Sequence, residues 1–170
     1  MPTSLKYLTH YSVDLQQKIQ KMLDNKTLAA FLLTKYPTPH KITNDKVLRD
    51  FVLNIKQQYL KKSSPLSKVI FDKKIHVVNN ALGLHSFVSR VQGSKLKSKN
   101  EIRVSSVLKK APKDFLTMIV VHELAHLKEK VHNKAFYQLC EHMLADYHQL
   151  EFEMRVFLTC VEHFGDLYAE

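Results

Sequence analysis

Apolar residues in the first third of the chain recur with the spacing of α-helices. Between residues 13 and 35 they return every three or four positions, which is the period of one helix face. The polar run Asp24-Asn25-Lys26 interrupts this spacing and predicts a break between two helices. A third helix is predicted after a cap at Thr43 or Asn44. Its apolar positions repeat every four residues, at Val47, Phe51, Ile55 and Tyr59.

The spacing changes from helical to alternating after Ser63-Ser64-Pro65, and alternation indicates β-strands. A strand pair is predicted from the apolar residues Val69, Phe71, Ile75, Val77 and Val78. Two further strands are predicted at residues 85–91 and 101–107, connected through the turn Gly93-Ser94. Together these segments predict a small antiparallel sheet.

A helical spacing returns at Ala111-Pro112 and continues to about Lys130. Proline is favoured in the first turn of a helix, and Asp114 lies near the positive end of the predicted helix dipole. Two helices are predicted to follow, one capped by Asn133 and the other with its apolar residues between positions 150 and 161.

The mixture of separate helices and strands predicts an α+β fold. All 170 residues are expected to form a single domain. Its helical N-terminal part would comprise residues 1–62, and residues 68–164 would hold the sheet, the long helix and the C-terminal helices.

Lysine and arginine outnumber aspartate and glutamate by 26 to 16, which gives a formal net charge of +10. This charge favours anionic partners such as a nucleotide, nucleic acid or an acidic surface. Cys140 and Cys160 are too few for a disulfide framework. The N-terminus has no signal-peptide core, and no apolar run reaches membrane-spanning length. We therefore expect a cytoplasmic protein with no membrane partner.

The run His122-Glu123-Leu124-Ala125-His126 lies within the predicted long helix. Its two imidazoles are four residues apart, or about 40° around the helix, so both can reach one ion. Glu123 is rotated by about 100° from His122, which suits a general base acting on a water molecule beside that ion. Zinc accepts neutral imidazole ligands and tolerates an open fourth position. The motif therefore predicts a Zn²⁺ site with Glu123 as the catalytic base.

A third ligand is required, and His132 follows His126 by six residues. The predicted cap at Asn133 places a bend at this point, which would turn His132 back toward the motif. The alternatives are Glu151, Glu153 and His142, all on later helices.

Basic residues gather around the predicted hairpin: Arg90, Lys95, Lys97, Lys99 and Arg103. They could bind the phosphates of a substrate, or they could protect a solvated edge strand from aggregation. Four further residues are candidates for polarising a substrate oxygen, and their spacing does not choose among them: His76, His85, His148 and Tyr147.

The stretch from His122 to Tyr137 resembles the YgjP-like group of metal-dependent hydrolases, which are related to SprT-like and Wss-type zinc metallopeptidases. The similarity covers about residues 68–158, including 80–85 and 89–93, and extends more weakly into the N-terminal helices. It implies a minimal zincin fold, in which a three-stranded antiparallel sheet lies beside the motif helix and an edge strand borders the substrate cleft. It also implies that Glu123 is catalytic and that zinc is bound by His122, His126 and His132.

The sequence departs from this resemblance at two places. Related metallopeptidases often have a glycine between the second and third histidines, where this chain has Lys128-Glu129-Lys130. Many also have Gly-Ser-Cys where this chain has Gly93-Ser94-Lys95. The first difference requires another construction of the turn, and the second alters the strand nearest the cleft.

These features favour one function and leave two alternatives. The favoured function is a zinc metallopeptidase, in which Glu123 activates water for attack on a peptide carbonyl. The first alternative is a nucleoside triphosphate pyrophosphatase that uses the same base, with the basic hairpin holding the phosphates. The second alternative is a non-enzymatic zinc protein that binds nucleic acid, although a structural metal site needs no adjacent base. The expected substrate is accordingly a peptide, a protein or a nucleotide.

Overall fold

The computed structural model describes residues 3–75, 83–92 and 95–169, with side chains for residues 5–75 and 100–169. The order of its elements is η1 (Thr3–Leu8), α1 (Val13–Asp24), α2 (Leu28–Lys35), α3 (Asp45–Tyr59), β1 (Leu66–Asp72), β2 (Gly83–Gln92), β3 (Lys95–Ser105), η2 (Ser106–Lys110), α5 (Lys113–Ala125), α6 (Lys134–Met143) and α7 (Tyr147–Phe164). This confirms the predicted α+β class.

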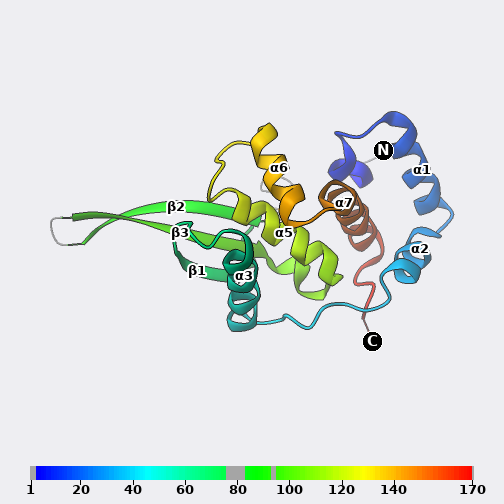
Figure 1. Ribbon diagram of the computed structural model, residues 1–170. Coiled ribbons are helices and arrows are strands. Elements are labelled where there is room, and N and C mark those ends of the chain that lie inside the picture. The colour runs from blue at the N-terminus through cyan, green and yellow to red at the C-terminus, as the bar shows by residue number, and fades with distance from the viewer. Residues whose placement is uncertain (1–2, 76–82, 93–94, 170) are drawn as a thin grey trace.

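Helix α5 lies at the centre of the molecule. It contacts β2 and β3 on one side and α6 and α7 on the other, and Figure 1 shows it between the sheet and these helices. Of its thirteen residues, the last eight, Met118–Ala125, are all buried. Its interior partners include Phe115 and Phe157, whose ring centroids lie 5.5 Å apart. A helix that is buried in this way holds its side chains in fixed positions.

The sheet has three strands in the order β1-β3-β2. Strands β2 and β3 are antiparallel, in a register that runs from Gly83 opposite Val104 to Gln92 opposite Lys95. Both strands extend well beyond the helices, to the left in Figure 1. Strand β1 pairs with β3 in parallel. The prediction of a wholly antiparallel sheet was therefore wrong for β1.

The reason is that β1 pairs with β3 and not with the next strand along the chain. Alternating apolar residues indicate a strand but carry no information about its direction. The predicted strand pair was also too long, because β1 ends at Asp72 and Ile75 follows it, while Val77 and Val78 lie outside the described residues. Strand β3 ends at Ser105, so Val107 belongs to η2.

The N-terminal helices follow the predicted order, with their break at Asn25 and Lys26. Helix α3 is capped by Asn44, whose side chain accepts a hydrogen bond from the Val47 amide at 2.9 Å. The predicted apolar face of α3 was partly wrong. Its fully buried residues are Leu48 and Val52, whereas Val47 is 39% exposed. The side of α3 that packs toward β1 is therefore the adjacent one, which carries Leu48 and Val52.

None of the helices within the described part of the chain combines the length and the apolar character that crossing a membrane demands.

His40 links the segment between α2 and α3 to the residues that directly precede α5. Its Nδ1 accepts a hydrogen bond from the Ile42 amide at 2.9 Å, so its Nε2 carries the hydrogen and donates to the Leu108 carbonyl at 2.7 Å. The His40 amide also donates to the Ala111 carbonyl at 3.0 Å. Burial lowers the pKa of His40, because a charged ring would lose solvation and could no longer accept from Ile42.

We predict that His40 contributes to a loss of stability in weak acid. Its folded pKa lies below the ordinary 6.5, so the unfolded chain binds a proton that the folded chain does not as pH falls below 6.5. The free energy of unfolding should therefore decrease through that range, and His40→Gln should flatten the slope. Urea unfolding between pH 5 and 8 measures this pH dependence of the free energy of unfolding. His10→Gln is the control, because His10 is exposed. An unchanged slope in His40→Gln would contradict the prediction.

Candidate metal centre

The structure brings together three histidines, which we call the histidine cluster: His122, His126 and His132. His122 lies in the last turn of α5, and His126 is the C-cap residue directly after this helix. Helix α5 was predicted to continue to about Lys130, but it stops at Ala125. The chain then turns back and reaches His132 immediately before Asn133, which caps α6 by accepting a hydrogen bond from the Phe136 amide at 2.8 Å.

The ring nitrogens of the cluster face one another. One nitrogen from each ring can be chosen so that all three lie within 4.8 Å of one another. The Nε2 atoms of His126 and His132 are 3.1 Å apart. Ligand nitrogens of a tetrahedral zinc ion are separated by about 3.3 Å, as follows from bonds of about 2.0–2.1 Å. The cluster therefore fits a small divalent ion that takes imidazole ligands.

The Phe136 ring packs against all three imidazoles. Its ring centroid lies 5.0, 4.7 and 4.9 Å from the ring centroids of His122, His126 and His132. Phe136 itself is completely buried, so its position is fixed by the core. The sequence does not indicate that Phe136 contacts the cluster, because its partners come from another helix and a loop.

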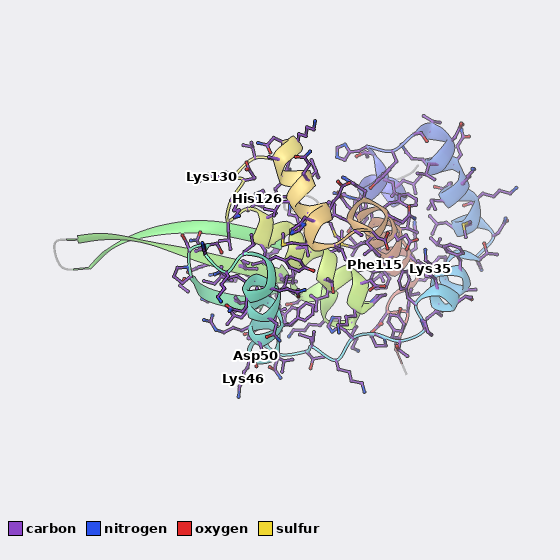
Figure 2. All side chains as sticks on the ribbon, viewed as in Figure 1. Lys35, Lys46, Asp50, Phe115, His126 and Lys130 are labelled. Atoms are coloured by element: carbon purple, nitrogen blue, oxygen red, sulfur yellow. The ribbon has the colours of Figure 1, made fainter. Side chains whose placement is uncertain are left out.

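The turn between the second and third histidines is built without glycine. The amides of Lys128 and Glu129 both donate to the Ala125 carbonyl, at 3.1 and 3.0 Å, which tightens the chain at the end of α5. No residue of this turn has a positive φ, since Lys26 and Gly165 are the only such residues in the described part of the chain. The Glu129 carbonyl accepts a hydrogen bond from His126 Nδ1 at 2.9 Å. Figure 2 shows His126 beneath the loop that carries Lys130.

His122 is oriented by a buried tyrosine. Its Nδ1 lies 2.7 Å from the hydroxyl of Tyr147, the first residue of α7. When Nε2 of His122 serves as the ligand atom, Nδ1 carries the hydrogen and donates it to Tyr147. The Cys140 thiol is a buried neighbour of this tyrosine and influences its pKa. Burial raises the pKa of Tyr147 strongly and that of Cys140 to about 12, so both stay protonated at neutral pH.

His122 is held in the form that a metal requires. Burial is the main cause that lowers its pKa from 6.5 to about 3, and the neighbouring histidines add to this effect. The ring is therefore neutral at neutral pH, with a lone pair available on Nε2.

Glu123 lies beside the cluster and is buried, with 3% of its surface exposed. Its Oε1 is 3.9 Å from Nε2 of His122, which is too far for a hydrogen bond. A carboxylate at this distance can contact a water molecule bound between the ring nitrogens and itself.

The three alternative ligands lie apart from the cluster. Glu153 is buried at the contact of α2 with α7, where it accepts hydrogen bonds from Lys35, Tyr36 and Gln149. Glu151 accepts from Arg155 at 3.4 Å, one turn further along α7. The ring of His142 packs edge-on against Tyr59, with centroids 5.6 Å apart. Of the four candidates for the third ligand, only His132 lies beside His122 and His126.

The basic residues of the hairpin are placed by the strand register. Arg90 on β2 is opposite Lys97 on β3, and Gln92 is opposite Lys95. The side chains of Arg90, Lys95, Lys97 and Lys99 lie outside the described ones. Arg103 is engaged elsewhere, because its guanidinium donates to Asp72 at 2.9 Å and to Glu101 at 3.2 Å.

Among the candidates for polarising a substrate oxygen, Tyr147 is fully buried behind His122. His148 is exposed and pairs with Glu141 at 3.1 Å. His76 lies outside the described residues, and His85 is described only as a residue of the edge strand β2.

A helix with the HExxH motif, a mixed sheet beside it and a third histidine on the next loop define a zincin-like domain. The sequence model of the YgjP-like family, described as a metallopeptidase domain, matches residues 10–156. The chain belongs to this YgjP-like family. A relative from Escherichia coli (strain K12) named UTP pyrophosphatase is 52% identical over 157 residues, which cover 92% of this chain and 94% of the relative. No solved structure matches the chain significantly. The family and the relative both indicate a hydrolase.

We predict that protein purified without added metal contains about one zinc ion per chain, and that His132→Ala loses most of it. The reason is that removing one of three ligands leaves an incomplete site. His142→Ala is the matched control, because it removes a histidine from α6 that lies outside the cluster. Elemental analysis of the purified variants measures the difference. Greater metal loss in His142→Ala than in His132→Ala would move the third ligand to another element.

We also predict that Tyr147→Phe weakens zinc binding by about 10- to 100-fold, the usual effect of losing a hydrogen bond behind a ligating histidine. Tyr137→Phe is the control, since Tyr137 is a neighbouring half-buried tyrosine whose ring centroid lies 6.3 Å from that of Tyr147. Competition with a chromophoric chelator measures the affinity, and circular dichroism checks the fold. Equal affinities in the two variants would show that the Tyr147 hydroxyl does not position His122.

Proposed function

We propose that this protein is a metal-dependent hydrolase that cleaves a phosphoanhydride bond of a nucleoside triphosphate. The observation that carries the proposal is the relative named UTP pyrophosphatase, which is 52% identical and aligns over almost the whole of both chains. The histidine cluster with Glu123 beside it supports a hydrolytic reaction. The net charge of +10 supports an anionic substrate, because it raises the local concentration of anions.

In this proposal the three histidines hold zinc through their inward-facing nitrogens, and Glu123 is the general base. A bound zinc ion would supply Lewis acidity, which lowers the pKa of water and offsets negative charge that develops on the substrate. Glu123 accepts the proton of the attacking water, whose oxygen forms the new bond to phosphorus. The bridging oxygen leaves with the electron pair of the broken bond and takes up the proton from Glu123.

The surroundings of Glu123 suit this role. Phe136 and the buried end of α5 exclude bulk water, so the carboxylate stays close to the reacting water and is not fully hydrated. Tyr147 and the Glu129 carbonyl hold the rings of His122 and His126, so the ligand atoms need not reorganise during the reaction.

Phosphate contacts are proposed for Arg90, Lys95 and Lys97 of the hairpin. Their support is the strand register, which places Arg90 opposite Lys97 and so concentrates positive charge on neighbouring strands. Arg103 is the least suited of the predicted set, since Asp72 and Glu101 already neutralise its guanidinium.

A metallopeptidase is the second candidate. It is favoured by the metallopeptidase-domain description of the family and by the edge position of β2, which contacts α5 and could pair with an extended peptide. The same base and ligands would serve, because hydrolysis of a peptide also needs an activated water. Offering the purified protein UTP, other nucleoside triphosphates and a peptide library, with and without chelator, separates the two. Cleavage of peptides alone would overturn the phosphoanhydride proposal.

We predict that Glu123→Gln lowers turnover by about 10²- to 10⁴-fold while zinc stays bound, because the amide keeps the size of the carboxylate but cannot accept the proton. Glu141→Gln makes the same change on the exposed surface of α6 and should leave turnover unchanged. Zinc content and turnover are measured on the same preparations. Loss of zinc in Glu123→Gln would make Glu123 a ligand, and full turnover in this variant would exclude it as the base.

A further inference from the structure

A cavity lies at the opposite end of α7 from the histidine cluster. Its volume is about 400 Å³, which falls within the range of small-molecule sites. It is lined by the turn after β1, by η2 and by the C-terminal half of α7. The tyrosine that contacts His122 begins α7, whereas Phe157 in the cavity wall is ten residues further on, or about 15 Å along the helix axis. The two sites are therefore separate.

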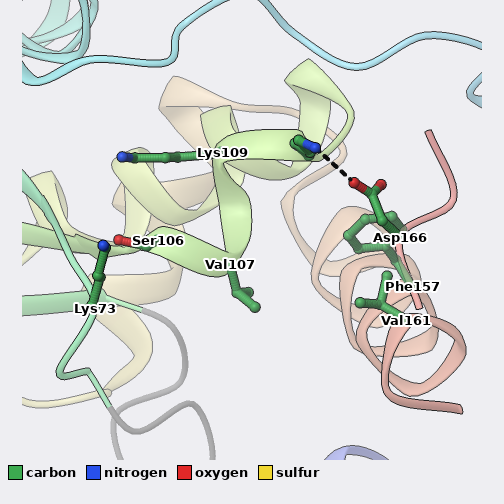
Figure 3. Close-up of a pocket in the computed structure, with 8 residues that line it drawn as sticks. Lys73, Ser106, Val107, Lys109, Phe157, Val161 and Asp166 are labelled. Atoms are coloured by element: carbon green, nitrogen blue, oxygen red, sulfur yellow. Dashed lines mark ion pairs between the residues drawn. The ribbon is translucent and has the colours of Figure 1, made fainter. Parts of the chain in front are cut away.

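One end of this cavity is cationic. Lys73, Ser106 and Lys109 line it, and Figure 3 shows their polar atoms toward the same end. Within the described part of the chain, neither Lys73 nor Lys109 forms an ion pair with a carboxylate. The Lys109 ammonium lies 5.4 Å from the centroid of the Phe71 ring, which fixes its position without neutralising its charge. An anion bound here would offset the repulsion between the two ammonium groups and could accept a hydrogen bond from the Ser106 hydroxyl.

The other end of the cavity is apolar. Phe157 and Val161 of α7 form its floor, and Val107 of η2 lines it while remaining 44% exposed. The acidic residue in the wall, Asp166, pairs with Lys110 at 3.2 Å, as the dashed line in Figure 3 shows. This pairing reduces the repulsion that Asp166 would otherwise exert on an anion.

We propose that this cavity binds a small organic phosphate, with the phosphate at Lys73, Lys109 and Ser106 and a planar or apolar group on the Phe157 floor. Inorganic phosphate would fill only the cationic end, and a neutral apolar molecule would leave the two ammonium groups unneutralised. A ligand that carries both parts matches both ends. The inference does not depend on the reaction at the histidine cluster, because it rests on residues of other elements.

The test uses the full-length metal-loaded protein and three probes: uridine monophosphate, uridine and inorganic phosphate. Uridine monophosphate joins a phosphate to a planar ring, so it should bind at least about tenfold more tightly than either part alone. Amide chemical shifts locate the site, and the expected changes fall on Ser106–Lys110 and around Val161. Shifts confined to residues 122–132 would overturn the proposal, as would equal affinities for uridine monophosphate and inorganic phosphate.

Adjacent lysines provide a matched pair of variants. Lys73 lines the cavity, whereas Lys74 is an exposed neighbour outside the lining, and each change to alanine removes one positive charge. Lys73→Ala should weaken binding of uridine monophosphate about tenfold, the usual effect of losing a charge-assisted hydrogen bond, and Lys74→Ala should leave it unchanged. Equal loss of affinity in both variants would show that only the net charge of the protein matters, and it would overturn the proposed site.

Discussion

The burial of α5 is the constraint on which the rest of the structure depends. From Met118 to Ala125 every residue of this helix is buried, including His122 and Glu123. Polar groups in such surroundings are costly unless they have partners. The partner of His122 Nδ1 comes from the start of α7, and the partner of His126 Nδ1 comes from the turn after α5. The packing of α7 and the shape of this turn therefore also determine which nitrogens face inward.

Much of this centre could be predicted from local sequence. The spacing of the two motif histidines follows from helical geometry, and the Asn133 cap predicted the bend that returns His132 to the cluster. The direction of β1 could not be predicted, because its pairing with β3 joins residues 33 or 34 positions apart. The role of Tyr147 was hidden for the same reason, since it lies 25 residues beyond His122 and no local pattern links them.

The histidine cluster and Glu123 do not by themselves distinguish a phosphoanhydride from a peptide substrate, since both reactions need a positioned water and a base. The distinction must arise from the groups that hold the rest of the substrate. A peptide would use the backbone of the edge strand β2, whereas a nucleotide would use cationic side chains. The hairpin combines an edge strand with basic residues on both of its strands, so its sequence and register suit either proposed substrate class.

The three histidines differ in their access to solvent: His122 is buried, His126 is half-buried and His132 is exposed. Any ion held by all three would therefore meet and leave the protein from the side of His132, the residue on the loop. His132 directly precedes the cap of α6, so its movement is tied to the first turn of that helix. Fraying of that turn would then open the route by which an ion exchanges, while the affinity at equilibrium would depend on all three rings.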